Sequence, residues 1–467
     1  MTYTRVNRAR IAPARLLVRG STMPDNVIDI DRAVQRFSRL LQIPTVSTRD
    51  ENDTDWAQFD RFRETLDALY PLIAAKLPKQ TFAGHTVVYH WDTGSPDEPI
   101  VLMAHQDVVS AGDPDGWTHP PFSGTVADGV IWGRGAIDDK GPLTCILEAV
   151  EHLLAQGFTP DRDVYLLFGH NEEVAGDGVP TVVEYFRQQG IVPGLVIDEG
   201  GAVAGDLFPL AQKIAAIGTA EKGILDLRLT ARDPGGHASM PGKNPATTRI
   251  ARALVKLGEF EFPPVITPPI MEMLTVMGTH AGGPLGAVLA RAERLHWLIT
   301  RLMPRSGPLM NAMIRTTAVP TVLEGSKGTN VMAETARAVV NVRILTGETV
   351  EGTVERIRKV IDDPDVRLDI LTASEPTPVS PTTGAAFDRV EKAVTQTFPG
   401  AVTSPFLVVG ATDARHLAQI SDYVYRFYPF ELDAGARGRI HSTDEQLTVE
   451  ALAGGIRFYE AVLRATH

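Results

Sequence analysis

Short Val/Ile/Leu-rich runs that end in histidine or acidic residues recur along the first half of this 467-residue chain. The clearest is the run 100–104, which leads directly into His105-Gln106-Asp107. Further clusters and one late histidine follow: Asp138-Asp139, Glu172-Glu173, Asp198-Glu199 and His441. If the apolar runs are parallel strands of one sheet, their carboxyl ends meet at the edge where open α/β sheets bind ligands. Imidazole and carboxylate groups together indicate a two-metal site that suits zinc, manganese or cobalt.

Extended and helical segments alternate along most of the chain. Strands are predicted at 80–90, 100–104, 164–168, 195–197, 402–409 and 423–427, and helices at 27–41, 141–155, 179–188, 386–397 and 448–465. This alternation is typical of βαβ units. We therefore predict an α/β domain, with a mostly parallel sheet and helices on both faces, that comprises residues 23–221 and 375–467.

Between these two parts the pattern changes. Strands at 224–231, 336–344 and 366–371 and helices at 244–257 and 350–361 match five of the six elements of a β-α-β-β-α-β order, which predicts a smaller ferredoxin-like α+β domain over 222–374. Residues 258–321 interrupt this order with prolines and an apolar helical stretch. The sequence leaves open whether this insertion lines an apolar substrate pocket, forms a dimer contact or packs on its own domain.

Composition makes several classes of partner less favourable. The 45 basic and 57 acidic residues give a net charge of −12, which disfavours binding to nucleic acid or to an anionic membrane. A single cysteine, Cys145, rules out an intrachain disulfide and fits a cytoplasmic location. No apolar stretch reaches the ~20 residues of a membrane span. Residues 1–22 contain five arginines and no acid, and we expect them to form a disordered basic arm that is not an export signal.

The roles of the clustered residues can be argued from their chemistry. Two cations at ~3.5–4 Å need a shared anionic ligand, and Asp138 is the candidate because it follows a glycine-rich stretch that allows a tight turn. Asp107 lies two residues after His105, so on an extended segment it can orient the imidazole. The adjacent Glu172 and Glu173 point in different directions, so that one can bind a metal while the other transfers a proton.

Six ordered motifs carry a resemblance to a known family: MAHQDVV, GRGAIDDKGP, HNEEVAGDG, DEGG, GGHASMP and IHSTDE. Together they resemble the aminoacylase, carboxypeptidase S and carnosinase family of two-zinc metallopeptidases, over nearly the whole chain. The nearest likeness is to carboxypeptidase S and the N-fatty-acyl-amino-acid hydrolases.

The resemblance implies a role for each matching residue. It implies that His105, Asp138 and Asp198 bind one zinc and that Asp138, Glu173 and His441 bind the other, with Glu172 as general base. Asp107 supports His105, and the Asp138-Asp139 peptide bond is cis. His237 stabilises the oxyanion, often from the partner subunit of a homodimer. Asn330 faces the reacting centre, and Arg343 or Arg415 binds the substrate carboxylate.

The expected activity is hydrolysis of an amide bond to an amino acid. A carboxypeptidase-like peptidase and an N-acyl-amino-acid hydrolase fit the residues equally well, because they differ only on the acyl side of the bond. A dipeptidase of the same family is the next alternative. A catalytically silent protein that binds peptides or metabolites is opposed by the complete set of expected ligands.

Overall fold

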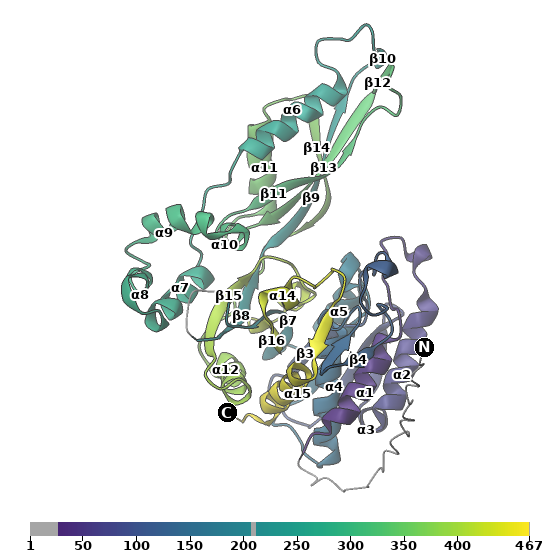
Figure 1. Cartoon of the computed structure of the whole chain (residues 1–467), viewed down its shortest axis with the longest axis vertical. Helices are drawn as coiled ribbons and strands as arrows, with labels where there is room; N and C mark the ends of the chain where they lie inside the picture. Colours follow the sequence, from purple (N-terminus) through teal and green to yellow (C-terminus); the bar gives the residue numbers. More distant parts are fainter. Residues whose placement is uncertain (1–26, 207–211, 467) are drawn as a thin grey trace, which may run out of the picture.

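The computed structural model describes residues 27–206 and 212–466, which form two domains (Figure 1). The larger domain contains the elements before residue 222 and after residue 375, and the inserted domain contains those between them. The basic arm predicted for residues 1–22 lies outside the described residues.

An eight-stranded sheet forms the centre of the larger domain. In spatial order its strands are β1 (Lys79–Phe82), β2 (Thr86–Trp91), β6 (Val164–Gly169), β3 (Ile100–His105), β7 (Leu195–Ala204), β16 (Val424–Glu431), β8 (Ile214–Glu221) and β15 (Val402–Val408). The pairs β6–β3, β3–β7, β7–β16 and β8–β15 are parallel, whereas β1–β2, β2–β6 and the pairings of β8 with β7 and β16 are antiparallel. The predicted mostly parallel α/β sheet is confirmed.

Helices cover both faces of this sheet. One face carries α1 (Ile30–Leu41), α2 (Trp56–Leu69), α3 (Pro71–Lys76), α4 (Lys140–Ala155), α12 (Ala385–Thr397) and α15 (Val449–Arg464). The other face carries α5 (Gly178–Gln189) and α13 (Ala414–Leu417). Ile100 and Leu102 pack on the first face and Val101 and Met103 on the second, because successive strand residues alternate. Burial on both faces explains why the run 100–104 is apolar without interruption.

A small antiparallel sheet, which the sequence pattern did not predict, lies beside the larger one. It consists of β4 (Thr125–Ala127), β5 (Val130–Trp132) and β17 (Gln446–Thr448), with β5 in the middle. The pairing of β17 with β5 joins the segment that follows His441 to the loop that precedes Asp138. Two segments far apart in the sequence are thereby held together.

The inserted domain is built on a four-stranded antiparallel sheet. Its strands, in spatial order, are β11 (Thr317–Glu324), β13 (Thr335–Ile344), β9 (Gly223–Arg232) and β14 (Val366–Ser374). Helices α6 (Ala246–Glu259) and α11 (Val350–Ile361) cover one face of the sheet and form a core with it. The predicted ferredoxin-like order is confirmed. At the end far from the larger domain, β10 (Gly236–His237) pairs with β12 (Val331–Met332) (Figure 1).

The insertion within this domain forms a helical lobe: α7 (Pro268–His280), α8 (Gly283–Leu289), α9 (His296–Leu302) and α10 (Pro308–Met313). The buried face of α7 carries Ile270, Met273 and Met277, which pack with Ile214 of β8 and Leu407 of β15. The lobe therefore covers the β8–β15 edge of the larger domain. The insertion packs on the larger domain as well as on its own domain, whose Leu345 belongs to the same apolar cluster. Its role in a substrate pocket or a dimer contact stays a prediction.

Among the described residues, no helix combines the length and apolar character needed to cross a bilayer.

The packing of the helical lobe gives a stability prediction. Ile270 is fully buried, so Ile270→Ala is expected to lower the free energy of unfolding by about 2–4 kcal/mol. Trp297 on α9 is 61% exposed, so Trp297→Ala is expected to change it by less than about 0.5 kcal/mol. Urea denaturation followed by circular dichroism compares the two variants. A larger loss for Trp297→Ala would contradict the packing described.

Candidate metal centre

Most of the candidate site residues converge at the carboxyl edge of the parallel strands. His105 is the last residue of β3, and Glu172 and Glu173 begin a short 3-10 turn, η3 (Glu172–Val174), just after β6. Asp198 and Glu199 lie within β7 rather than past its end. Asp138 comes from the loop before α4, and His441 from the segment before β17. The candidate ligands therefore come from five different segments of the chain.

Two groups of donor atoms share Asp138. His105, Asp138 and Glu199 form the first group, and Asp138, Glu173 and His441 form the second, with the donor atoms of each group within 4.8 Å of one another. His105 Nε2 lies 3.0 Å from Asp138 Oδ1. His441 Nε2 lies 2.9 Å from the other oxygen, Asp138 Oδ2, and 3.1 Å from Glu173 Oε2. Asp138 therefore offers one oxygen to each group, as a bridging carboxylate must.

The structure places Glu199, not Asp198, in the first group. Glu199 Oε1 lies 3.8 Å from His105 Nε2, whereas Asp198 Oδ2 accepts a hydrogen bond of 2.8 Å from the backbone of Ala414. The assignment of Asp198 to this zinc stays a prediction, and Glu199 is a candidate ligand that the prediction did not include. The cause of the Glu199 position is local: the pairing of β7 with β16 shifts register after Asp198, where Gly200 has a φ of +148°. The sequence marked the acid pair, but regular strand alternation does not reveal this irregularity.

Asp107 holds the two glutamates and the histidine in place, as expected for a supporting residue. It is fully buried, and its oxygens accept hydrogen bonds from the backbone N–H groups of Glu172 at 3.2 Å and Glu173 at 3.1 Å. Ser47 donates a further bond of 2.6 Å, and His105 Nδ1 lies 3.3 Å from Asp107 Oδ1. Although burial opposes it, hydrogen bonds from His105 and Ser47 lower the pKa of Asp107.

A buried glutamate that the sequence did not single out fixes the loop of Asp138. Glu445 accepts hydrogen bonds from the backbone N–H groups of Gly135 at 2.9 Å, Ile137 at 2.8 Å and Asp138 at 3.0 Å. It also pairs with Arg134 at 2.7 Å. Gly135 has a φ of +88°, and a Cβ there would lie 2.8 Å from the side chain of Val108, so glycine is required. The Asp138-Asp139 peptide bond is cis, as the resemblance implied.

Tyr428 of β16 is a second residue that the sequence did not indicate. Its buried hydroxyl donates to Asp138 Oδ1 at 3.2 Å and also to Glu199. The sequence around Tyr428 is aromatic and apolar and gives no sign of a polar contact. Tyr428 reaches Glu199 because its strand, β16, lies beside β7.

The centre concentrates negative charge. Burial and the negative charge of Asp138 raise the pKa of Glu199 to about 8. Burial and the negative charge of Glu199 raise the pKa of Glu172 well above its usual value. Hydrogen bonds to Asp138 and Glu173 raise the pKa of His441 to about 10. These shifts show how strongly the carboxylates favour added positive charge.

A pair of divalent cations fits this donor set. The ligands are imidazole nitrogens and carboxylate oxygens, which zinc, manganese and cobalt accept. Glu173 Oε1 and Asp139 Oδ1 are buried oxygens without a hydrogen-bond partner among the described residues. Such unpaired acceptors are costly unless a cation or proton meets them. Cys145 is buried in α4 and belongs to neither group, so a thiolate site does not form here.

Glu172 lies beside the two groups without belonging to either. Its Oε1 lies 4.0 Å from Arg415 Nη1, and Arg415 is itself held by a bond of 2.7 Å to the Thr412 carbonyl. Burial and the neighbouring Arg415 lower the pKa of Arg343, which also interacts electrostatically with Glu172. Arg343 stands near the end of β13 and Arg415 in α13. Two arginines, one from each domain, are therefore brought to the Glu172 side of the centre.

His237 and Asn330 are close to each other but not to this centre. They lie at the distal tip of the inserted domain, where the Ala238 N–H donates to the Asn330 carbonyl at 3.0 Å (Figure 1). Both side chains are exposed, and His237 Nδ1 accepts a bond of 3.1 Å from the Ser239 N–H. Within one chain, the fold does not bring His237 to the metal ligands.

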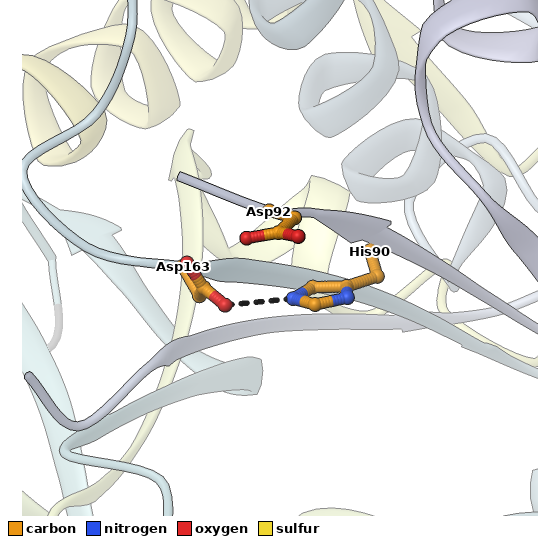
Figure 2. Close-up of side chains that lie close together, drawn as sticks. All are labelled: His90, Asp92 and Asp163. Atoms are coloured by element: carbon orange, nitrogen blue, oxygen red, sulfur yellow. Dashed lines mark hydrogen bonds and ion pairs between the residues drawn. The ribbon is translucent and has the colours of Figure 1, made fainter. Parts of the chain in front are cut away.

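A third cluster of metal-binding side chain types, His90, Asp92 and Asp163, lies near the opposite edge of the sheet (Figure 2). His90 Nε2 lies 2.8 Å from one oxygen of Asp163, and the other oxygen accepts two bonds of 2.8 Å from Thr93. Asp92 accepts from the Gly94 N–H at 2.9 Å. Since these oxygens are engaged in local hydrogen bonds, we interpret the cluster as a cap on the end of β2.

Comparison with known proteins identifies the family to which the chain is similar. The family model described as "Peptidase family M20/M25/M40" matches residues 101–465. A probable carboxypeptidase S-like protein 2 of Dictyostelium discoideum is 34% identical over 94% of this chain and 85% of its own length. The human N-fatty-acyl-amino acid synthase/hydrolase PM20D1 is 32% identical over 94% of this chain and 89% of its own length.

The fold has a solved counterpart. An M20 family metallo-carboxypeptidase from Sulfolobus solfataricus superposes with a TM-score of 0.69 at 16% identity, covering 92% of this chain and 98% of that one. The two-domain architecture is therefore the one found in that enzyme. Since the family model spans most of the chain, this protein belongs to peptidase family M20/M25/M40 and is a metallohydrolase of amide bonds to amino acids.

Proposed function

We propose that this protein hydrolyses the amide bond between an acyl group and an amino acid whose carboxylate is free. The observation that carries the proposal is the shared carboxylate of Asp138, which offers one oxygen to each of two donor groups. A two-metal centre requires such a bridge between its cations.

We assign His105, Asp138 and Glu199 to one metal and Asp138, Glu173 and His441 to the other. Zinc is the preferred ion, and cobalt or manganese suits the same donors. When bound, the cations supply positive charge that acidifies a water molecule and polarises the scissile carbonyl.

Glu172 serves as the general base in this proposal. It is held next to the centre through its own backbone bond to Asp107, and its carboxylate belongs to neither ligand group. It takes a proton from the attacking water and then passes it to the leaving amine nitrogen. Its raised pKa suits a group that must retain a proton between these two steps.

Arg343 and Arg415 bind the carboxylate of the substrate in this proposal. They approach Glu172 from the two domains, so a substrate held between them lies with its amide near the centre. Arginine suits this role because its guanidinium can form two parallel hydrogen bonds to a carboxylate.

The acyl side of the substrate distinguishes the remaining alternatives. The relatives' names support two of them equally, a carboxypeptidase and an N-fatty-acyl-amino-acid hydrolase. A dipeptidase is the next alternative, and a catalytically silent binding protein is opposed by the complete set of donors around Asp138.

We also propose that His237 acts in a homodimer, at the centre of the partner subunit. Its place at the distal tip leaves it exposed and far from its own Asp138 (Figure 1). The neighbouring β11 is an edge strand with exposed Val319, Val322 and Leu323. An apolar edge strand is open to pairing with a second chain, which supports a dimer through this domain.

The activity is tested with matched N-acetyl, long-chain N-acyl and dipeptidyl forms of one amino acid. Chromatography measures the amino acid released by zinc-loaded protein. Glu172→Gln is expected to slow release by about 10²–10⁴-fold, because a general base is lost. The matched control is Glu184→Gln, at an exposed position of α5, which should leave the rate of amino acid release unchanged. Release that survives Glu172→Gln, or no release with two metals bound, would refute the proposal.

The role of His237 is tested by mixing two inactive variants. His237→Ala is expected to lower turnover by about 10²–10³-fold with unchanged metal content. If His237 acts across the dimer, a mixture with Glu172→Gln forms heterodimers with one intact site and recovers about a quarter of wild-type activity. A mixture that stays inactive although subunits exchange would place His237 in its own chain's site or outside catalysis.

Metal affinity is expected to rise with pH. The raised pKa of His441, about 10, means that metal-free protein holds a proton there at pH 7, and the same holds for His105. A metal must displace these protons, so affinity should increase by up to about tenfold per pH unit for each proton released. Calorimetry between pH 6 and 8 measures this slope. His441→Ala should reduce the slope and the number of metals, whereas His280→Ala should not; a pH-independent affinity would contradict the assignment.

A further inference from the structure

The outward face of the helical lobe has an unusual composition for a protein surface. On α9, Trp297 is 61% exposed and Leu302, the last residue of the helix, is 50% exposed, whereas Ile299 is buried. Arg301 lies one turn after Trp297 and therefore on the same face. Trp297 and Arg301 thus share one exposed face, and Leu302 is exposed at the end of the same helix.

Basic residues outnumber acidic ones in residues 282–307 of the lobe. Residues 282–307 contain Arg291, Arg294, Arg301 and Arg305, all exposed, and one acid, Glu293. In the part of the chain that the structure describes, no carboxylate pairs with these guanidinium groups, and Arg291 and Arg305 donate only to carbonyls of their own segments. This concentration stands out on a chain with a net charge of −12.

An apolar hollow lies next to this face. Its cavity of about 440 Å³ is lined by the apolar residues Pro264, Val265, Ile266 and Met271 and by the polar residues Glu293, His296 and Thr300. Helices α8 and α9 project sideways from the junction of the two domains, away from the sheet of the larger domain (Figure 1). A broad planar surface can therefore contact the lobe without contacting the strands that carry the candidate metal ligands.

We propose that this lobe binds the surface of an anionic phospholipid bilayer. Arginines next to exposed tryptophan and leucine are the combination that rests at the headgroup boundary, with the apolar groups inserted and the cations at the phosphates. The overall charge of −12 opposes binding only weakly at physiological salt, because charges more than about 8 Å from the surface are screened. This contact is independent of the proposed amide hydrolysis and needs no membrane-spanning helix.

The test is sedimentation of the full-length, metal-loaded protein with vesicles. Binding is expected to vesicles of phosphatidylcholine with about one-third phosphatidylglycerol, to weaken in high salt, and to be much weaker with phosphatidylcholine alone. Changing Arg291, Arg294, Arg301 and Arg305 together to Gln is expected to lower the partition coefficient at least about tenfold, since each basic residue contributes about fivefold. Trp297→Ala should weaken binding while both variants keep wild-type circular dichroism.

A matched control removes the same charge elsewhere. Arg39, Arg61, Arg232 and Arg358 are exposed on other elements, and changing them together to Gln should leave at least most of the binding. Deletion of residues 1–26, which contain five arginines, should also leave it. Vesicle binding that is lost on this deletion but kept in the lobe variant would overturn the proposal. So would the absence of binding by the wild-type protein, or equal loss in the lobe variant and the matched control.

Discussion

The carboxylate of Asp138 lies between two groups of donor atoms, and a buried glutamate rather than the central sheet fixes its position. Glu445 accepts three backbone hydrogen bonds from the loop that carries Asp138, and it follows His441 by four residues. One side chain therefore ties together the bridging residue and the segment of the last histidine. The small sheet of β4, β5 and β17 supports the same junction.

The centre gathers carboxylates that repel one another in the absence of cations. Glu172, Glu173, Asp198 and Glu199 all have raised pKa values for which burial is the largest cause. Such a cluster is unfavourable for folding by itself, and bound cations relieve it. Tyr428 limits the cost by donating to the carboxylate of Glu199, whereas Asp107 holds the backbone of Glu172 and Glu173 and adds a further negative charge. Metal binding and the stability of this region are therefore linked.

The junction between the domains connects the strands that carry Arg343 to the helical lobe. Lys222 is buried there and donates to the carbonyls of Ala312 and Arg315 at the end of the lobe. Burial lowers its pKa to about 7. The lobe packs on the β8–β15 edge, and the strands of the inserted domain that begin at this junction carry Arg343. The position of Arg343 relative to Arg415 thus depends on packing some distance from the metal ligands.

The sequence by itself determined the α/β sheet, the inserted domain and the set of acid and histidine clusters, because strand periodicity and the residues that end a strand are local properties. Only the tertiary structure decided which members of those clusters meet. Glu199, not Asp198, lies in the first donor group because β7 loses its register with β16 at Gly200, and Tyr428 and Glu445 act through strands distant in the sequence. His237 lies at the far tip because its neighbours are set by the β10–β12 pairing, a long-range contact that no local pattern encodes.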